Sequence, residues 1–200
     1  DGTGNPQPGS AHAERIIWGV GEGDGGGTKN LEPWIDNGTS MVIRRIAMNV
    51  DEWDELDRPA QEGVIGRFLG SGAPLTGEHE HDTPDFEALG PTGFPIISDI
   101  SHIRRARSDD PDEAMFRRSF NYDEPPATSG DTLHGQTGVS QTGLIFVAFQ
   151  CDVEQQYIPV QDRLAETDHL NLWTIPIGSA VFAVPPGCQP DGYIGEALFA

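Results

Sequence analysis

One histidine of this chain is followed closely by two pairs of arginines. His102 lies in the stretch SHIRRA, and a second arginine pair begins the stretch RRSF at 117–120. These four arginines belong to a chain with only twelve Lys and Arg residues but 32 Asp and Glu residues. Guanidinium groups bind anions through charge-assisted hydrogen bonds, and a neutral imidazole is a common metal ligand. The pattern favours an anionic ligand beside His102, while a core histidine with a satisfied hydrogen bond is the alternative.

A second cluster of potential metal ligands is the stretch EHEHD at 78–82, with two imidazoles and three carboxylates. These side chains could hold a metal ion, but they alternate along a polar loop that provides little preorganisation. A charged surface loop is therefore the preferred interpretation. The glycine-rich stretch at 19–30 lacks the Gly-Lys-Ser/Thr ending of a phosphate-binding loop, so no nucleotide site is expected there.

Charge and composition argue against several classes of protein. The net charge is −20, and Lys29 is the only lysine. Phosphate backbones and anionic membranes would repel such a chain, so nucleic-acid binding is not expected. Cys151 and Cys188 are the only cysteines, and they form neither a disulfide framework nor a zinc-ligand motif. No apolar stretch reaches the length of about 18 residues that a membrane-spanning helix needs.

The elements that must position these residues alternate between strands and helices. The apolar, β-branched stretch at 39–50 predicts a first strand, and TGLIFVAFQCD at 142–152 predicts a buried, central strand. The other expected elements are short helices at 51–56 and 59–70, an extended segment at 114–125, a helix at 153–166 and a strand at 177–187. The stretch at 99–108 is too short to assign. This order predicts an α+β sandwich of the ferredoxin-like type over residues 39–200.

Several motifs together resemble the dye-decolourising peroxidases, a family of haem proteins. They are DGTGNP, IGR…GAPL, SHIRRA, RRSFNYDEP, GLIFVAFQCD and AVFAVPPG, which occur in the family's order over nearly the whole chain. The family signature is G-x-x-D-G, and this chain begins at its Asp. The resemblance implies the second half of a duplicated ferredoxin-like protein that binds haem b. Residues 1–38 would then be the distal haem loop with a glycine-rich excursion, and the N-terminal half would be a separate fragment or a missing segment.

The resemblance also implies roles for individual residues. His102 is expected to bind the haem iron, and Arg117 is expected to stabilise negative charge on the opposite, distal side. Asp1 would be the distal acid–base group. Asp152, at the end of the apolar strand, is predicted to accept the second ring N–H of His102, although an ordinary strand-end acid is equally consistent. Further haem contacts are expected from Gly2, Thr3, Gly4, Arg107 and Ser119, although RSD replaces the family's Asn-Pro-Arg turn after the histidine.

The implied function is the reduction of hydrogen peroxide coupled to the oxidation of dyes, phenols or another aromatic reductant. A periplasmic iron-handling or porphyrin-dechelating activity on the same fold is the alternative. A non-enzymatic, acidic metal-binding module built on residues 78–82 is a third interpretation. By the same resemblance, we expect export by a twin-arginine route, to the periplasm or the outside of the cell, and a possible homo-oligomer.

Overall fold

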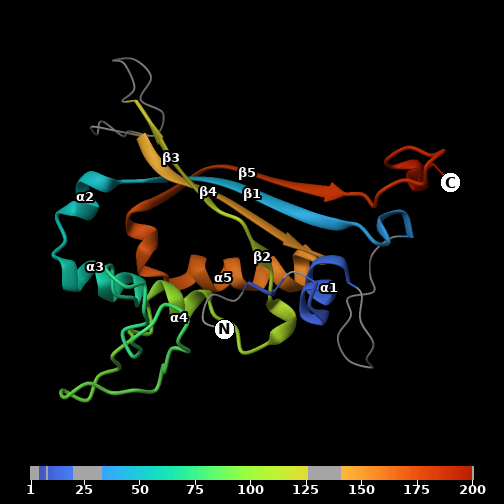
Figure 1. Ribbon diagram of the computed structural model, residues 1–200. Helices are drawn as coiled ribbons and strands as arrows, with labels where there is room; N and C mark the ends of the chain where they lie inside the picture. The colour runs from blue at the N-terminus through green and yellow to red at the C-terminus, as the bar shows by residue number, and fades with distance from the viewer. Residues whose placement is uncertain (1–4, 8, 20–32, 126–140, 200) are drawn as a thin grey trace.

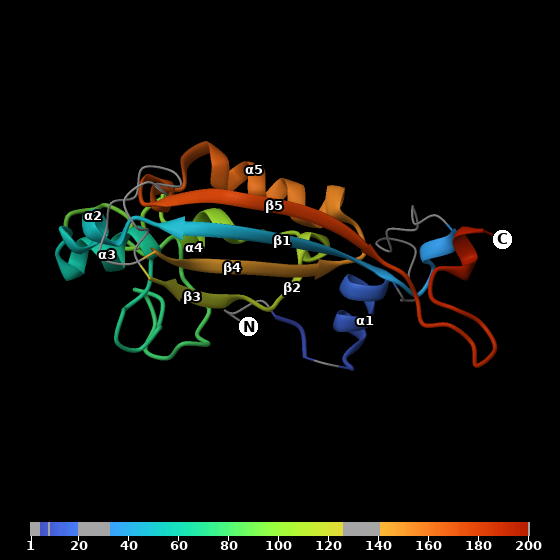
Figure 2. The ribbon, with the colours of Figure 1, turned by 90° about the horizontal axis from the view of Figure 1, so that it is seen from above.

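A five-stranded antiparallel sheet forms the centre of the molecule. The computed structural model describes residues 5–7, 9–19, 33–125 and 141–199. The strand order is β2–β4–β1–β5, and β3 also pairs with β4. The strands are β1 (Thr39–Met48), β2 (Phe116–Arg117), β3 (Phe120–Glu124), β4 (Gln141–Gln150) and β5 (Thr174–Val184). Figure 1 and Figure 2 show helices α1 (Ala11–Trp18), α4 (His102–Ala106) and α5 (Ile158–Thr167) on one side of the sheet, with α2 (Val50–Asp54) and α3 (Arg58–Ile65) at one end.

The order of elements confirms the predicted α+β, ferredoxin-like fold. β1 is followed by helices, then by β2, β3 and β4, then by α5 and β5. The first strand lies between β4 and β5, as the βαββαβ pattern requires. The apolar stretch at 142–152 forms β4, which has neighbours on both sides and is therefore central, as expected. Among the described residues, no helix is both long and apolar enough to cross a lipid bilayer.

Helix α1 lies within the segment 1–38, for which the sequence predicts only loop. The Ser10 side chain caps it by accepting from the backbone N–H of Ala13, and Gly19 ends it in a left-handed conformation with φ of 67°. Glycine adopts this conformation without steric cost. Ala13 and Ile16 are buried. A helix of this length is marginally stable in isolation, so burial of its apolar side stabilises it.

The buried amide of Gln156 connects three separate parts of the fold. Gln156 lies in a π-helical turn, η4 (Val153–Tyr157), between β4 and α5. Its Nε2 donates to the carbonyl oxygens of Ile16 (3.0 Å) and Ala114 (2.6 Å). Its Oε1 accepts from the backbone N–H of Asp152 at 2.7 Å and lies 3.2 Å from Sγ of Cys151. One side chain thus joins α1, the segment before β2 and the end of β4.

Residues of the opposite sheet face lie in register without a helix to cover them. Met41 of β1 pairs with Phe149 of β4 and with Phe182 of β5. Phe182 is 47% exposed, and the other two side chains are half-buried. The alternate residues face the helices, since Phe146 of β4 packs against the ring of Tyr157 before α5. Within the described part of the chain, the part of this face around Met41, Phe149 and Phe182 is therefore apolar and has no helix over it.

We predict that Gln156→Leu destabilises the fold by about 3 kcal/mol, because several buried backbone groups lose their hydrogen-bond partner. Gln155→Leu is the matched control, since Gln155 is exposed, and its effect should stay within about 0.5 kcal/mol. Urea denaturation of both variants measures the difference. Equal stability of the two variants would show that the amide has no such role.

Candidate functional site

His102 is held by a buried carboxylate. It is the first residue of α4, and Ser101 before it is extended and fully buried. The His102 Nδ1 atom lies 2.7 Å from Oδ2 of Asp168, whose side chain is only 3% exposed, while the His102 side chain is 36% exposed. An ionised carboxylate only accepts hydrogen bonds, so Nδ1 is the donor here, and in the neutral imidazole Nε2 then carries the free lone pair. The imidazole therefore has a fixed orientation and one nitrogen available for a ligand.

The chain around Asp168 explains why its carboxylate occupies this position. Asp168 directly follows α5 and precedes η5 (His169–Leu172), and its Oδ1 accepts from the backbone N–H of Leu170 at 3.0 Å. The next backbone N–H, of His169, donates to the carbonyl oxygen of Ile100 at 3.0 Å. One carboxylate oxygen thus fixes the turn and the other orients His102. A backbone hydrogen bond ties the two loops together.

The prediction that Asp152 accepts from His102 is wrong. Asp152 lies at the N-terminus of η4, where its Oδ1 accepts from the backbone N–H groups of Glu154 (2.8 Å) and Gln155 (3.1 Å). Asp152 is therefore the N-cap of η4, and its carboxylate bonds neighbouring backbone groups rather than His102. Sequence reasoning missed Asp168, although an acid at the end of the predicted helix at 153–166 was a visible candidate. No local feature of the sequence distinguishes Asp168 from other acids near an element end, such as Asp152.

Arg117 is joined to the first motif of the chain by an amide side chain. Asn5 Oδ1 accepts from the backbone N–H of Arg117 at 2.8 Å, and Asn5 Nδ2 donates to its carbonyl oxygen at 2.9 Å. Burial, and secondarily the charge of Arg67, lower the pKa of the Arg117 guanidinium. The stretches DGTGNP and RRSF therefore meet in the fold.

The predicted haem contacts of the other site residues are not tested by the structure. Ser119 is exposed between β2 and β3, and Arg107 is exposed directly after α4. The structure gives neither of them a contact that tests a haem-binding role. Asp1, Gly2, Thr3 and Gly4 lie outside the described residues, so their predicted roles stay predictions.

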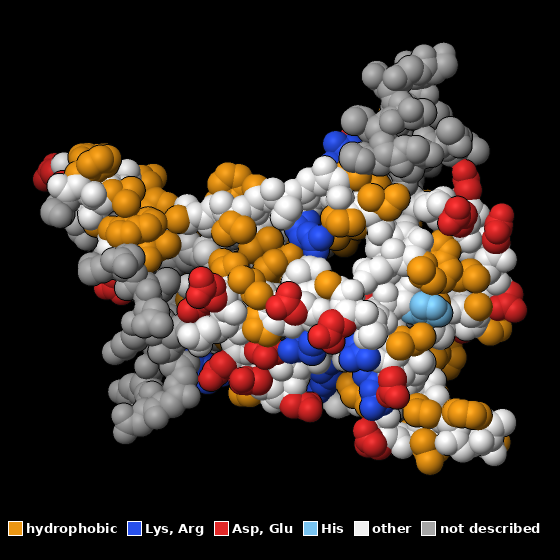
Figure 3. All heavy atoms as spheres, turned by 180° about the vertical axis from the view of Figure 1, so that it is seen from behind, with side chains coloured by type: hydrophobic (Ala, Val, Ile, Leu, Met, Phe, Trp, Pro, Cys, Tyr) orange, Lys and Arg blue, Asp and Glu red, His pale blue; other side chains and the backbone are white. Residues whose placement is uncertain are grey.

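The arginines that follow His102 take part in the packing of neighbouring segments. Arg104 forms ion pairs with Asp99 (3.1 Å) and Glu87 (3.6 Å) and donates to the carbonyl oxygen of Phe86. Nε of Arg105 is buried and has no hydrogen-bond partner among the described residues. On the face shown in Figure 3, Arg side chains lie beside Asp and Glu side chains. Arg104 is thus largely neutralised by protein groups, whereas one polar atom of Arg105 is left for another partner.

One carboxylate of the EHEHD loop, that of Asp82, bonds backbone groups of the same loop. Asp82 Oδ2 accepts from the backbone N–H groups of His79 and Glu78, both at 2.8 Å, and these bonds lower the pKa of the carboxyl group. Across the described ranges, no group of three or more His, Cys, Asp or Glu side chains is arranged to hold a metal ion. The preferred interpretation of a charged loop agrees with these contacts.

The fold and the site define an α+β domain in which a buried carboxylate orients a partly exposed histidine. The chain belongs to the Dyp-type peroxidase family, because its residues 1–189 match the family model described as Dyp-type peroxidase, C-terminal. This agrees with the resemblance seen in the motifs.

Named relatives and solved structures support the same assignment. The chain is 40% identical over 167 residues to a dye-decolorizing peroxidase of Thermobifida fusca, which covers 82% of this chain and 37% of the relative. It is 34% identical over 204 residues to a deferrochelatase of Escherichia coli, covering 99% of this chain and 44% of the relative. The chain therefore spans less than half the length of these curated relatives.

Among solved structures, a DyP-type peroxidase from Cellulomonas bogoriensis is 47% identical, with a TM-score of 0.83 over 99% of this chain and 50% of that chain. An oxyferrous/water mixed complex of DtpA from Streptomyces lividans is 37% identical, with a TM-score of 0.82 over 100% of this chain and 51% of that chain.

We predict that Asp168→Ala frees the His102 ring, since no other carboxylate bonds its Nδ1 in the described structure. In proton NMR, the strongly deshielded resonance of a carboxylate-bonded imidazole N–H should disappear. Asp152→Ala is the matched control, because Asp152 bonds only backbone N–H groups nearby, and it should leave this resonance in place. The assignment fails if Asp152→Ala removes the signal and Asp168→Ala preserves it.

Proposed function

We propose that the chain belongs to a haem peroxidase that reduces hydrogen peroxide and oxidises phenols, dyes or similar reductants. In balanced form, one hydrogen peroxide and two phenols give two water molecules and two phenoxyl radicals. The single observation that carries this proposal is the His102–Asp168 pair, in which a buried carboxylate fixes an imidazole and leaves its Nε2 available. Family membership supplies the cofactor class.

The residues present fit a haem. Nε2 of His102 would bind the iron, and the buried, unpartnered Nε of Arg105 offers a donor for a propionate group. When bound, haem b supplies the iron centre that reacts with peroxide and takes up its oxidising equivalents. Asp168 would make the imidazole a stronger electron donor, because it accepts the hydrogen bond from Nδ1.

Arg117 is proposed to act on the distal side. Although burial lowers the pKa of its guanidinium, an arginine stays protonated at any pH the protein would meet. Its fixed positive charge would stabilise the negative charge that develops as the O–O bond of peroxide breaks. The paired hydrogen bonds from Asn5 hold the Arg117 backbone for this task.

Asp1 completes the proposed proton transfer. It lies in the same DGTGNP motif as Asn5, whose side chain bonds Arg117. Its carboxylate would accept a proton from peroxide and deliver it to the departing oxygen. Gly2, Thr3 and Gly4 follow it, and small residues allow close approach of the backbone to a haem edge.

The open sheet face favours a further protein partner for this domain. Met41, Phe149 and Phe182 present an apolar surface, and the relatives are more than twice as long as the part that matches this chain. We propose that the N-terminal half of the protein packs here. Export and a homo-oligomeric state remain predictions from the family resemblance.

Release of iron from haem is the second candidate function, because several relatives are named deferrochelatase. Iron transfer from bound haem to a chelator, in the absence of peroxide, would favour this function over peroxide reduction.

We predict that His102→Ala removes most bound haem, because it deletes the proposed iron ligand. The Soret absorbance per protein should fall accordingly after purification with added haem. His79→Ala is the matched control, since His79 is exposed in the EHEHD loop, and it should retain the Soret band. Full haem content with a normal spectrum in His102→Ala would refute the ligand assignment.

We predict that Arg117→Leu keeps its haem but reacts with peroxide about 10²–10³-fold more slowly, the usual cost of deleting one preorganised charge-stabilising group. Stopped-flow absorbance measures this rate. Arg118→Leu is the matched control, because the adjacent Arg118 is exposed and its guanidinium lies over the ring of Phe120. Equal rates in the two variants would contradict the distal role of Arg117.

A further inference from the structure

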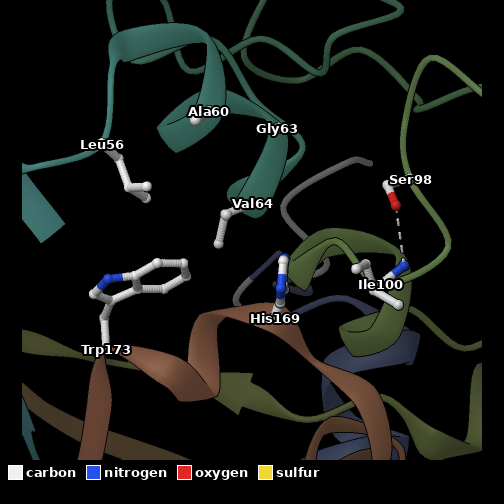
Figure 4. A pocket seen from close by; sticks show the side chains of 8 residues that line it. All are labelled: Leu56, Ala60, Gly63, Val64, Ser98, Ile100, His169 and Trp173. Atoms are coloured by element: carbon white, nitrogen blue, oxygen red, sulfur yellow. Dashed lines mark hydrogen bonds between the residues drawn. The ribbon is translucent and has the colours of Figure 1, made fainter.

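A cavity of about 280 Å³ lies between α3 and η5, next to the His102–Asp168 pair. Figure 4 shows the side chains of Trp173 and His169 from below and those of Leu56 and Val64 from above, facing the same space. No Asp, Glu, Lys or Arg is among the described residues that line it. The cavity is therefore apolar, with His169 as its main polar group.

The walls of this cavity are fixed by hydrogen bonds and ring contacts. The backbone N–H of His169 donates to the carbonyl oxygen of Ile100 (3.0 Å), and the N–H of Asn49 donates to that of Trp173 (2.8 Å). The ring of Trp173 meets those of Trp53 and His169 edge to face, with centroid distances of 5.3 Å and 6.0 Å. Such a cavity exists before a ligand arrives, which is typical of small-molecule sites.

Size and charge define the class of ligand. A dry apolar cavity of roughly 150 Å³ is large enough to bind benzene. The volume of about 280 Å³ is thus large enough for one substituted aromatic ring. A charged ligand would find no ion-pair partner among the described lining residues. A phenol fits best, because its ring can pack against Trp173 and Leu56 while its hydroxyl group reaches the imidazole of His169.

Two residues that line the cavity lie close in sequence to His102 or to its partner Asp168. Asp168, which bonds His102, directly precedes His169, and Ile100 lines the cavity two residues before His102. We infer that this cavity binds an uncharged, single-ring aromatic molecule such as a phenol. This inference rests on the proposed function: the cavity is the site at which a small reductant binds, near the His102 side of the haem.

The glycine in α3 permits a direct test. A Cβ added at Gly63 would meet no heavy atom within 4 Å, and Gly63 lines the cavity, so Gly63→Leu adds apolar volume there. Leucine also favours the helix over glycine, so the fold is retained. Ala165→Leu is the matched control, because Ala165 is an exposed residue of helix α5 that does not line the cavity.

Binding of 4-fluorophenol to the full-length protein is measured by fluorine NMR without peroxide. The wild type and Ala165→Leu should bind with equal affinity. The affinity of Gly63→Leu should be at least about tenfold lower, a difference of about 1.4 kcal/mol. Equal binding by Gly63→Leu, or no binding by the wild type, overturns the inference. If Gly63→Leu does not fold, Ala60→Leu fills the same cavity and is judged by the same outcomes. Because no peroxide is present, failure here is distinct from failure of the proposed peroxidase reaction.

Discussion

The hydrogen bond between His102 Nδ1 and Asp168 Oδ2 is the contact on which the site depends. At 2.7 Å, with a carboxylate that is almost completely buried, it is a charge-assisted bond in surroundings of low dielectric constant. Each partner lies at a helix boundary: His102 begins α4 and Asp168 follows α5. The orientation of the imidazole is thus set by where two helices begin and end, and any change in their packing would change it.

The two candidate catalytic groups come from different layers of the fold. His102 belongs to the helical layer, whereas Arg117 belongs to the short strand β2, which pairs with the central strand β4. A sheet resists bending because its strands are hydrogen-bonded to one another, so it provides a stable position for a buried guanidinium. The helical layer is joined to it partly through Gln156, whose amide reaches α1 and the segment before β2. Sheet and helices are therefore coupled by polar contacts as well as by apolar packing.

The sequence predicted the strands better than the contacts between them. Periodicity and β-branched residues identify β1 and β4 because those strands are long and apolar, and the order of elements then limits the topology. Helix α1 was missed because its first turn follows a loop rich in glycine and proline, and its stability comes from burial of Ile16. The choice of Asp152 over Asp168 failed for a related reason. Nothing local distinguishes a carboxylate that caps a turn from one that crosses the structure to a histidine.

The residue that follows Asn5 has a consequence for chemical durability. Asn5 satisfies both the donor and the acceptor of the Arg117 backbone, across 112 positions of sequence, because its side-chain amide carries an acceptor oxygen and a donor nitrogen. Asparagine commonly deamidates when the next backbone nitrogen, carrying a hydrogen, attacks its side chain to form a cyclic imide. The next residue here is Pro6, which is buried and has no backbone N–H. The Asn–Pro sequence therefore protects this connection against spontaneous ageing, which would otherwise turn the donor into a second acceptor facing a carbonyl oxygen.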